Sequence, residues 1–567
     1  MTNPGPHPSG LPPCDLVMKG GVTSGVVYPS AVLELSTRYR FQSLGGTSAG
    51  AIAASVSAAA EYARQRSGSI ELRGLDDVVQ AFSRPGFFLG LFAPTAAARP
   101  MFDLGLRLAR ARGSRRRQSA ALARTGIAYR PWPAATALIA AIGVLVLLLY
   151  GFRHLALAPA VVLTVLAATV LMMLAAWTVI APLVSLGRAV HHSVGADGFG
   201  LCTGMSAGAG EGLTQWLHRQ IQHCAGLPAD QPLTFAMLKE AGIALQMVAT
   251  DLGLARPVRI PFAEEQYLFA PAELARLFPA EVVAHVLKVA GVPAAERESS
   301  RTWFLPSDQL PVVIGARLSS SVPVLLSSLR LYSAHAEASG PVESYMTDGG
   351  LTSNFPIHFF DDWLPSHPTF GLDLVTGTST DPDAPAVFMP DGDLGPRLPP
   401  SAGIHTLGSF FGHVQDASRN WRDELQAELP GFRDRVCQIR MGPGEGGFHL
   451  DADPATLEQL VTRGRQAGQE ILGTFDWDRH RFVRYLTLMA LLRENFLLLS
   501  ERLDNVGAWP ENADAPFAID AATASREQLL EVNRATVELI QRAAGLSALA
   551  AQWRSEPEPS MRVGPRV

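Results

Sequence analysis

The segment 46–50 reads GTSAG and places Ser48 between Gly46 and Gly50 at GxSxG spacing. An apolar strand candidate precedes it and an alanine-rich helix candidate follows it. This strand-to-helix context is that of a nucleophile elbow, in which small neighbours allow a tight turn and the serine hydroxyl is exposed. The following helix directs its N-terminal partial positive charge at the same place. The pattern predicts that Ser48 is a nucleophile, and a glycine-rich turn with an incidental serine is the alternative.

A second glycine-rich segment, 19–25, reads KGGVTSG and lies between another strand candidate and a helix candidate. Backbone N–H groups at the start of a helix bind anions, and Gly20 and Gly21 let the backbone approach a reacting carbonyl group. With Val22 they predict an oxyanion hole, which needs donors about 3 Å from the developing charge. A phosphate-binding loop fits less well, because GxxxxGK[ST] and a regular GxGxxG are missing. A plain structural turn is the other alternative.

A third segment, 348–350, reads Asp-Gly-Gly, which most often forms a turn. Alone, it gives little reason to assign catalysis to Asp348. His358 follows later, so the Ser, Asp, His chain order of the α/β-hydrolases is also present. Because His358 lies in the apolar segment 356–360, which is typical of a helix start packed on a core, we do not expect it to be catalytic.

Taken together, these three segments resemble the patatin-like phospholipases in their order along the chain. The segments 232–235 and 248–252 are similar to that family's central strand region, and 316–323 is similar to the helix before its aspartate strand. The resemblance covers about residues 14–100 and 196–376. It is closest to bacterial-type members and leaves out the apolar segments and the C-terminal helices.

The resemblance implies a three-layer α/β sandwich with a mostly parallel central sheet and a Ser–Asp dyad in place of a triad. Ser48 would attack an acyl-ester carbonyl, and Asp348 would take its proton and return it to the leaving group. Water would then hydrolyse the acyl-enzyme. A free carboxylate with a pKa of about 4 is a weak base, so a dry site that raises this pKa would help. No metal or cofactor is implied, and the motif glycines would be Gly46, Gly50, Gly349 and Gly350.

The first loop departs from the family pattern, which usually reads GGGxRG. Val22 stands at the third glycine and Ser24 at the basic position. Backbone N–H donors survive a change from glycine to valine where the conformation allows it. We therefore expect the departure to affect rate and substrate class more than reaction type.

Strand and helix candidates alternate along the chain, which predicts an α/β domain with a mostly parallel sheet. The strand candidates are 15–17, 41–44, 243–249 and 370–375, and the helix candidates include 26–35, 49–60, 206–223, 454–475, 480–503 and 526–544.

Two apolar runs, 134–152 and 155–184, contain no charged residue. About 20 apolar residues span a bilayer core, and helices in water normally show a polar stripe. The runs predict a two-span transmembrane hairpin, with a pair of buried core helices as the alternative. The apolar segment 482–499 holds three charged residues, so we expect a core or partner helix there rather than a third span.

The segment Arg107–Arg130 contains eight arginines and no acid just before the first run. Positive flanks stay on the cytoplasmic side, so we expect a bacterial cell-membrane protein whose catalytic domain faces the cytoplasm. The arginines are expected to contact anionic lipid. A solvated charged face is the alternative, and a nucleic-acid arm is a weaker one.

Composition excludes several other classes of protein. Of 567 residues, 47% are hydrophobic and 17% are charged, which excludes a largely disordered chain. A net charge of −5 argues against a nucleic-acid binder. Four scattered cysteines without a CxxC pair support neither a zinc ribbon nor a disulfide scaffold. The Pro/Gly-rich start lacks the features of a secretory signal.

The expected organisation has seven parts. They are a disordered N-terminus (1–13), a first catalytic part (14–100), an Arg-rich juxtamembrane segment (101–132), the hairpin (133–186), a second catalytic part (196–400), a C-terminal helical region (401–554) and a disordered tail (555–567).

The expected function is fatty-acyl ester cleavage in membrane glycerophospholipids. A lysophospholipase, a neutral-lipid lipase and an acyltransferase are alternatives within the same chemistry. A non-catalytic membrane scaffold is the alternative from another class. The sequence leaves head-group preference and oligomeric state open.

Overall fold

The computed structural model describes the chain from Gly10 to Val506, with internal gaps, and a short helical piece beyond it. The prediction for the C-terminal tail, residues 1–9 of the predicted disordered N-terminus and residues 111–131 of the predicted Arg-rich segment fall outside the described residues. The residues not described are 1–9, 22–23, 70, 85, 97, 111–131, 155–158, 160, 163, 175, 178–179, 182–183, 185–197, 207, 209, 298–300, 335–340, 377–384, 391–409, 411–413, 415–430, 443–444, 446–451, 507–530, 532–533 and 543–567.

The strands lie close to the predicted ones where a prediction was made. They are β1 (Pro13–Met18), β2 (Arg40–Gly46), β3 (Gly200–Cys202), β4 (Ala244–Asp251), β5 (Arg256–Ile260), β6 (Tyr267–Phe269), β7 (Trp303–Phe304), β8 (Val324–Leu326), β9 (Leu329–Ser333), β10 (Val342–Asp348), β11 (Thr369–Thr376), β12 (Val387–Phe388) and β13 (Val436–Met441).

The helices begin with the two that the sequence predicts around the glycine-rich segments. They are α1 (Val27–Ser36), α2 (Ala49–Ser67), α3 (Leu75–Phe82), α4 (Phe87–Leu91), α5 (Arg99–Arg110), α7 (Trp132–His154), α9 (Leu213–Ala225), α10 (Phe235–Glu240), α11 (Pro271–Leu277), α12 (Ala280–Val289), α13 (Val312–Ser319), α15 (Pro454–Thr474) and α16 (Trp477–Val506). Short 3₁₀ turns are η1 (Ser24–Val26), η2 (Ala294–Glu296), η3 (Gly349–Leu351), η4 (Ile357–Phe360) and η5 (Arg433–Arg435).

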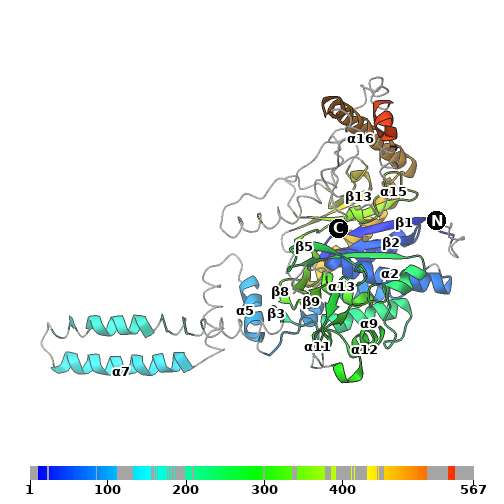
Figure 1. Ribbon diagram of the computed structural model, residues 1–567. Coiled ribbons are helices and arrows are strands. Elements are labelled where there is room, and N and C mark those ends of the chain that lie inside the picture. Colours follow the sequence, from blue (N-terminus) through cyan, green and yellow to red (C-terminus); the bar gives the residue numbers. More distant parts are fainter. Residues whose placement is uncertain are drawn as a thin grey trace.

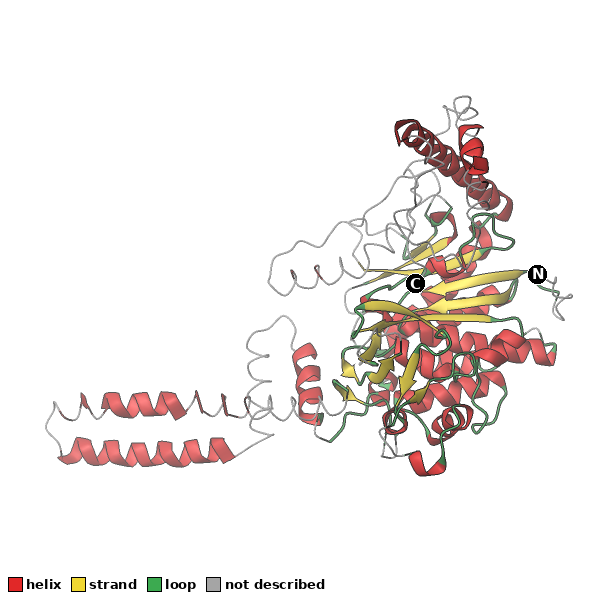
Figure 2. Ribbon diagram, in the orientation of Figure 1, coloured by secondary structure: helices red, strands yellow, loops and turns green. Residues whose placement is uncertain are grey.

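In the described part of the chain, eleven strands form one sheet in the order β12-β13-β11-β1-β2-β4-β10-β9-β6-β7, with β5 beside β4. Figure 2 shows the strands in yellow at the centre of the molecule, with helices in red packed beside them. All neighbours from β13 through β11, β1 and β2 to β4 are parallel. The outer pairs are antiparallel. The prediction of a mixed α/β fold is confirmed, with the parallel arrangement holding at the centre of the sheet.

The central strand β1 is buried on both faces. Leu16 and Met18 belong to the main apolar core, whereas Val17 packs in a smaller cluster with Phe355 and Phe432. A parallel strand covered on both sides needs apolar residues at consecutive positions. This requirement explains why the short run LVM forms a strand in the middle of the sheet.

Two helix packings hold the elements that carry the site. α2 packs against β2, α9 and α13 (Figure 1), and the residue contacts show that α1 packs along α15. The second packing is close because Gly464 of α15 lies on the backbone of α1, where an added Cβ would be 2.0 Å from the Val27 carbonyl oxygen. The hydroxyl of Ser30 also donates to the carbonyl of Val461 at 2.9 Å.

The apolar runs do not form the predicted transmembrane hairpin. The first run lies in α7, and the second is described only as helical pieces between 159 and 184. In the part of the chain that the structure describes, no helix combines the length and apolar character needed to cross a bilayer. The prediction of a two-span cell-membrane protein facing the cytoplasm is therefore wrong. That prediction relied on the absence of charged residues, whereas a membrane span requires a single helix that is sufficiently long and apolar.

The alternative of two buried core helices is also not found. Leu138 and Ile139 of α7 are 63% and 70% exposed. Figure 1 shows α7 extending away from the sheet. The absence of charged residues in these runs therefore indicated neither a membrane span nor a buried core helix correctly.

The C-terminal region was predicted to be helical, but it also contains a strand. β13 lies within the segment 401–554 and pairs in parallel with β11. The expected boundary at residue 400 therefore cuts through the central sheet. α15 and α16 form as predicted, and α16 contains the apolar segment 482–499.

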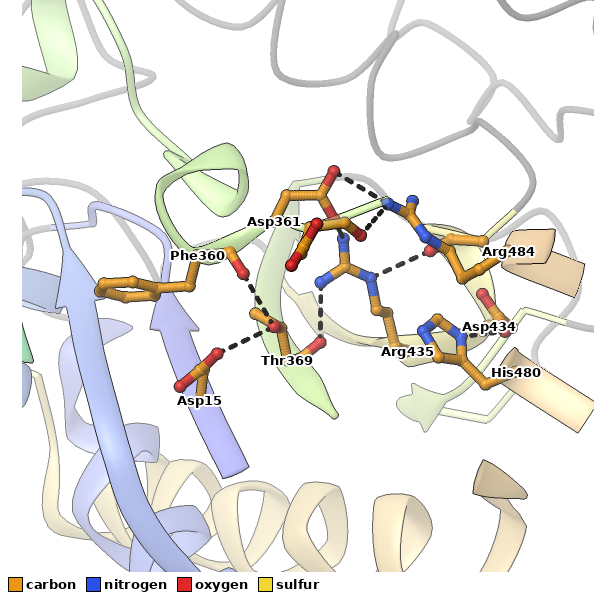
Figure 3. Close-up of polar contacts among 10 residues, drawn as sticks. Asp15, Phe360, Asp361, Thr369, Asp434, Arg435, His480 and Arg484 are labelled. Carbon is orange, nitrogen blue, oxygen red and sulfur yellow. Dashed lines mark hydrogen bonds and ion pairs between the residues drawn. The ribbon is translucent and has the colours of Figure 1, made fainter. Parts of the chain in front are cut away.

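A group of charged side chains joins α16 to the sheet (Figure 3); its arginines and histidine are buried and its two carboxylates are half-buried. Arg435 donates to Asp361 at 2.5 Å and to the carbonyl of Thr369 at 3.0 Å. Arg484 donates to the other oxygen of Asp361 at 3.2 Å. His480 and Asp434 share a hydrogen bond of 2.6 Å. We call Asp361, Asp434, Arg435, His480 and Arg484 the charged cluster.

Candidate active site

Ser48 stands at the turn between β2 and α2, where the backbone is strained. Its φ of 56° and ψ of −122° lie in a region that a non-glycine residue rarely adopts. Such a conformation costs about 1–3 kcal/mol and persists only when the surrounding structure enforces it. The side chain is largely buried, at 4% exposed. The local geometry is the one expected of a nucleophile elbow.

The two glycines beside Ser48 are required by close backbone contact. An added Cβ at Gly50 would lie 2.1 Å from the carbonyl oxygen of Met18, and one at Gly46 would lie 2.5 Å from the carbonyl carbon of Gly50. The start of α2 thus rests directly on the ends of β1 and β2. Any larger residue would force the turn open.

Asp348 ends β10 and meets Ser48 directly. The Ser48 hydroxyl donates to Oδ2 of Asp348 at 2.6 Å, across 300 residues of sequence. The predicted contact is therefore confirmed. The short distance leaves no room for an imidazole between the two groups, which argues against a triad passing through His358. His358 itself lies in η4.

The backbone around Asp348 orients its carboxylate. The Gly350 N–H donates to Oδ1 at 2.7 Å, which leaves Oδ2 for Ser48. Thr250 donates its hydroxyl to the carbonyl of Asp348 at 2.9 Å. Gly349 allows this loop to lie against β4, because an added Cβ would be 2.1 Å from the Val248 carbonyl oxygen.

The loop after β1 borders the nucleophile, but its glycines have different roles. The Gly20 N–H donates to the carbonyl of Asn354 at 2.9 Å, so in this structure it is not available to an oxyanion. An added Cβ at Gly20 would lie 3.3 Å from the Cβ of Ser48. This corrects the expected role of Gly20: it permits close approach and fixes the loop. Gly21 follows it, and Val22 lies outside the described residues.

A buried ion pair supports the same loop. The ammonium group of Lys19 donates to Asp373 of β11 at 2.7 Å, with both side chains nearly inaccessible to solvent. Tyr28 donates its hydroxyl to the carbonyl of Lys19. Burial raises the pKa of Tyr28 well above its usual value, and the charge of Asp373 adds to this. The tyrosine therefore stays protonated and keeps this hydrogen bond.

An apolar cavity opens beside Ser48. Its aromatic wall is closely packed, since the ring centroids of Phe82 and Trp216 lie 5.7 Å apart and those of Phe82 and Phe88 lie 5.1 Å apart. A cavity with apolar walls and one reactive hydroxyl suits a hydrocarbon chain that ends in a carbonyl group. It is lined by Gly25, Pro29, Ser48, Ala49, Ile52, Ala53, Val56, Phe82, Phe88, Leu91, Phe92, Leu213, Trp216, Ser320, Val322 and Leu326.

Within the described part of the chain, neither the cysteines nor the metal-ligating side chains form a competing site. All four cysteines are buried, and burial raises the pKa of Cys202 and of Cys224 to about 12, which keeps these thiols protonated. Among the described residues, no group of three or more His, Cys, Asp or Glu side chains could hold a metal ion.

Sequence reasoning missed two serines that contact the dyad. Ser319 accepts a hydrogen bond from the Ser48 backbone N–H at 3.1 Å, and the carbonyl of Ser321 accepts from the Asp348 N–H at 2.9 Å. The segment 316–323 carried part of the family resemblance, but its spacing gave no sign of these contacts.

Comparison with known proteins identifies a relative but no activity. No family model matches the chain. A protein of Rhizobium meliloti (strain 1021) named "RpoH suppressor" is 30% identical over 558 residues, and the alignment covers 85% of each chain. This name states no activity or substrate.

Proposed function

We propose that this chain, which belongs to the same family as the RpoH suppressor of Rhizobium meliloti, is a serine-dependent lipid acyl hydrolase of the patatin-like type. The observation that carries the proposal is the 2.6 Å hydrogen bond from Ser48 to Asp348 at the wall of an apolar cavity. The α/β sheet that presents the elbow supports it. We propose glycerophospholipids as the substrate class.

In the proposed reaction, the acyl chain occupies the cavity and its ester carbonyl lies over Ser48. As Oγ attacks the carbonyl carbon, Asp348 takes the hydroxyl proton through Oδ2 and then returns it to the leaving alcohol. An acyl-enzyme remains on Ser48. A water molecule, activated by the same carboxylate, hydrolyses the acyl-enzyme and restores the serine.

The developing negative charge needs donors that are not already engaged. The N–H groups of Gly20 and Ser48 donate to Asn354 and Ser319. We therefore assign the oxyanion hole to the N–H of Ala49, directly after the nucleophile, and to that of Gly21. The first N–H groups of a helix lack partners within that helix, and the partial positive charge at the start of α2 favours the oxyanion.

The test is fatty-acid release from phosphatidylcholine and phosphatidylglycerol vesicles by the purified chain, with a fluorophosphonate probe as a second readout. We expect Ser48→Ala to abolish both release and labelling. Ser55→Ala is a matched control, because Ser55 is buried in the same helix and donates to its own helix carbonyl at Ala51.

Wild-type protein that is folded but neither labelled nor active on any acyl ester would favour a non-catalytic scaffold. Labelling that persists in Ser48→Ala would place the nucleophile elsewhere. Analysis of the released products on diacyl lipid, monoacyl lipid and triacylglycerol then separates phospholipase, lysophospholipase and neutral-lipid lipase activity.

A further inference from the structure

The C-terminal end of α13 touches the backbone of both members of the dyad. The Ser319 hydroxyl oxygen accepts the Ser48 N–H at 3.1 Å, and the Ser321 carbonyl accepts the Asp348 N–H at 2.9 Å. The Ser321 carbonyl also accepts the Thr347 hydroxyl at 2.8 Å. One short segment therefore bridges two residues that are 300 positions apart.

A buried arginine, Arg317, fixes the segment 319–321 that bridges the dyad. Arg317 donates to the Ser321 hydroxyl, to the Ser327 carbonyl at 2.9 Å and to the Thr203 carbonyl at 3.1 Å. Ser321 in turn donates its hydroxyl to the carbonyl of Arg317 at 2.8 Å. These bonds tie the end of α13 to two neighbouring loops, so the bridge has little freedom to move.

The Ser48 N–H needs this acceptor because of the shape of its turn. With φ at 56°, the peptide before Ser48 cannot follow the usual helical or extended path. Ser319 is fully buried, so its hydroxyl is a fixed acceptor and not one that water could readily replace. Without the Ser319 hydroxyl, the buried N–H of Ser48 would lose its hydrogen-bond partner, and relaxation of the strained turn would lower the free energy.

We propose that Ser319 is a positioning residue that holds Ser48 in its strained turn, so that the hydroxyl faces Asp348. This inference depends on the proposed function, because it concerns the geometry of the same reaction. Ser319 acts on the backbone of the nucleophile. Its loss should therefore slow the chemical step and leave binding of the acyl chain nearly unchanged.

The test compares Ser319→Ala with wild type and with Ser55→Ala, using a soluble acyl ester such as a p-nitrophenyl ester. We expect kcat to fall about 10- to 100-fold in Ser319→Ala, as misplacement of a reacting group by up to 1 Å can produce. KM should change less than twofold. The rate of fluorophosphonate labelling should fall by the same factor as kcat. Ser55→Ala should match wild type in all three quantities.

Two results would overturn the inference while leaving the proposed function intact. One is Ser319→Ala with wild-type kcat and labelling rate. The other is an equal fall in kcat in Ser55→Ala, which would indicate general loss of packing. If circular dichroism shows that Ser319→Ala is poorly folded, Ser319→Thr, which keeps the hydroxyl, serves as the second variant. We expect its labelling rate per folded molecule to exceed that of Ser319→Ala. A labelling rate no higher than that of Ser319→Ala would also overturn the inference. An inactive, unlabelled wild type would instead refute the proposed function.

Discussion

The dyad and the charged cluster lie toward opposite ends of the parallel strands, and their carboxylates have different hydrogen-bond donors. Asp348 accepts hydrogen bonds from a hydroxyl and from a backbone N–H, both uncharged donors. Asp361, near the start of β11, is paired with the guanidinium groups of Arg435 and Arg484 (Figure 3). The two sites therefore differ in the charge of the groups that donate to the carboxylate.

The two regions also differ in what holds them: a strained backbone at the dyad, and contacts between side chains in the charged cluster. Ser48 has a strained φ of 56° beside an open cavity. The charged cluster instead joins β11, β13 and α16 through side chains that bond to carbonyl and carboxylate groups. On the proposed function, the end of the parallel strands beside Ser48 carries the chemistry, whereas the opposite end holds the C-terminal helices. Substitutions at three residues test this division.

The largest effect is expected from Asp348→Asn. The amide keeps the shape of the side chain but cannot accept a proton, so we expect the hydrolysis rate to fall about 10²- to 10⁴-fold. The thermal unfolding midpoint should stay the same or rise, because active-site carboxylates are commonly costly to stability. Ester hydrolysis and calorimetry on the same preparation measure both. Activity within tenfold of wild type would refute the assignment of Asp348 as the proton acceptor. It would also refute the contrast between the two ends of the parallel strands.

The opposite profile is expected from Arg435→Ala. This change leaves Asp361 with one guanidinium partner and opens the contact between β11 and β13, so we expect a loss of about 3–5 kcal/mol in the free energy of unfolding. The kcat per folded molecule should remain within twofold of wild type. Urea unfolding and active-site titration with fluorophosphonate measure the two quantities.

Arg435→Met is the matched control, because it keeps much of the volume without the charge. It should lose less stability than Arg435→Ala. A large fall in kcat in either variant, with folding intact, would mean that the charged cluster also serves the active site.

The smallest effect concerns the pH dependence of stability through Asp434. Burial raises the pKa of this carboxyl, but the hydrogen bond from His480 and the charges of His480 and Arg435 lower it by more. A carboxyl whose pKa is lowered by folding stabilises the protein above its unfolded pKa of about 3.9. That contribution is lost as pH falls through the folded pKa.

We therefore expect wild type to lose stability more steeply than Asp434→Asn as the pH is lowered from about 4. Urea unfolding at a series of acidic pH values measures the two slopes. Parallel curves would show that the His480 contact contributes no pH-dependent stability. The hydrolysis rate at neutral pH should not differ between the two proteins.

Much of the local structure could be read from the sequence. The strand-turn-helix around Ser48 follows from an apolar run, two glycines and an alanine-rich segment, and all three appear at the expected positions. β4 and β11 also match their apolar runs. In each case the signal is short-range, because hydrophobic periodicity and glycine content act within a few residues.

Other parts required the assembled molecule. The apolar runs predicted two membrane spans, yet no described helix meets the requirements for one. β13 joined the central sheet from a region expected to be helical, because pairing with β11 supplied hydrogen-bond partners that its own sequence does not reveal. Gly20 was expected to be an oxyanion donor, but the carbonyl of Asn354 engages its N–H.

By itself, the sequence determined which short segments could turn tightly, which strands would be buried and that Ser48 would stand at an elbow. The family resemblance also predicted that Asp348 meets this hydroxyl. Only the tertiary structure decided that Ser319 accepts a hydrogen bond from its backbone and that Arg435 and Arg484 share Asp361. The reason is physical: these contacts join residues far apart in the chain, and their distances are set by how the sheet and helices pack. A hydrogen bond depends on a few tenths of an ångström, which no local pattern of residues can specify.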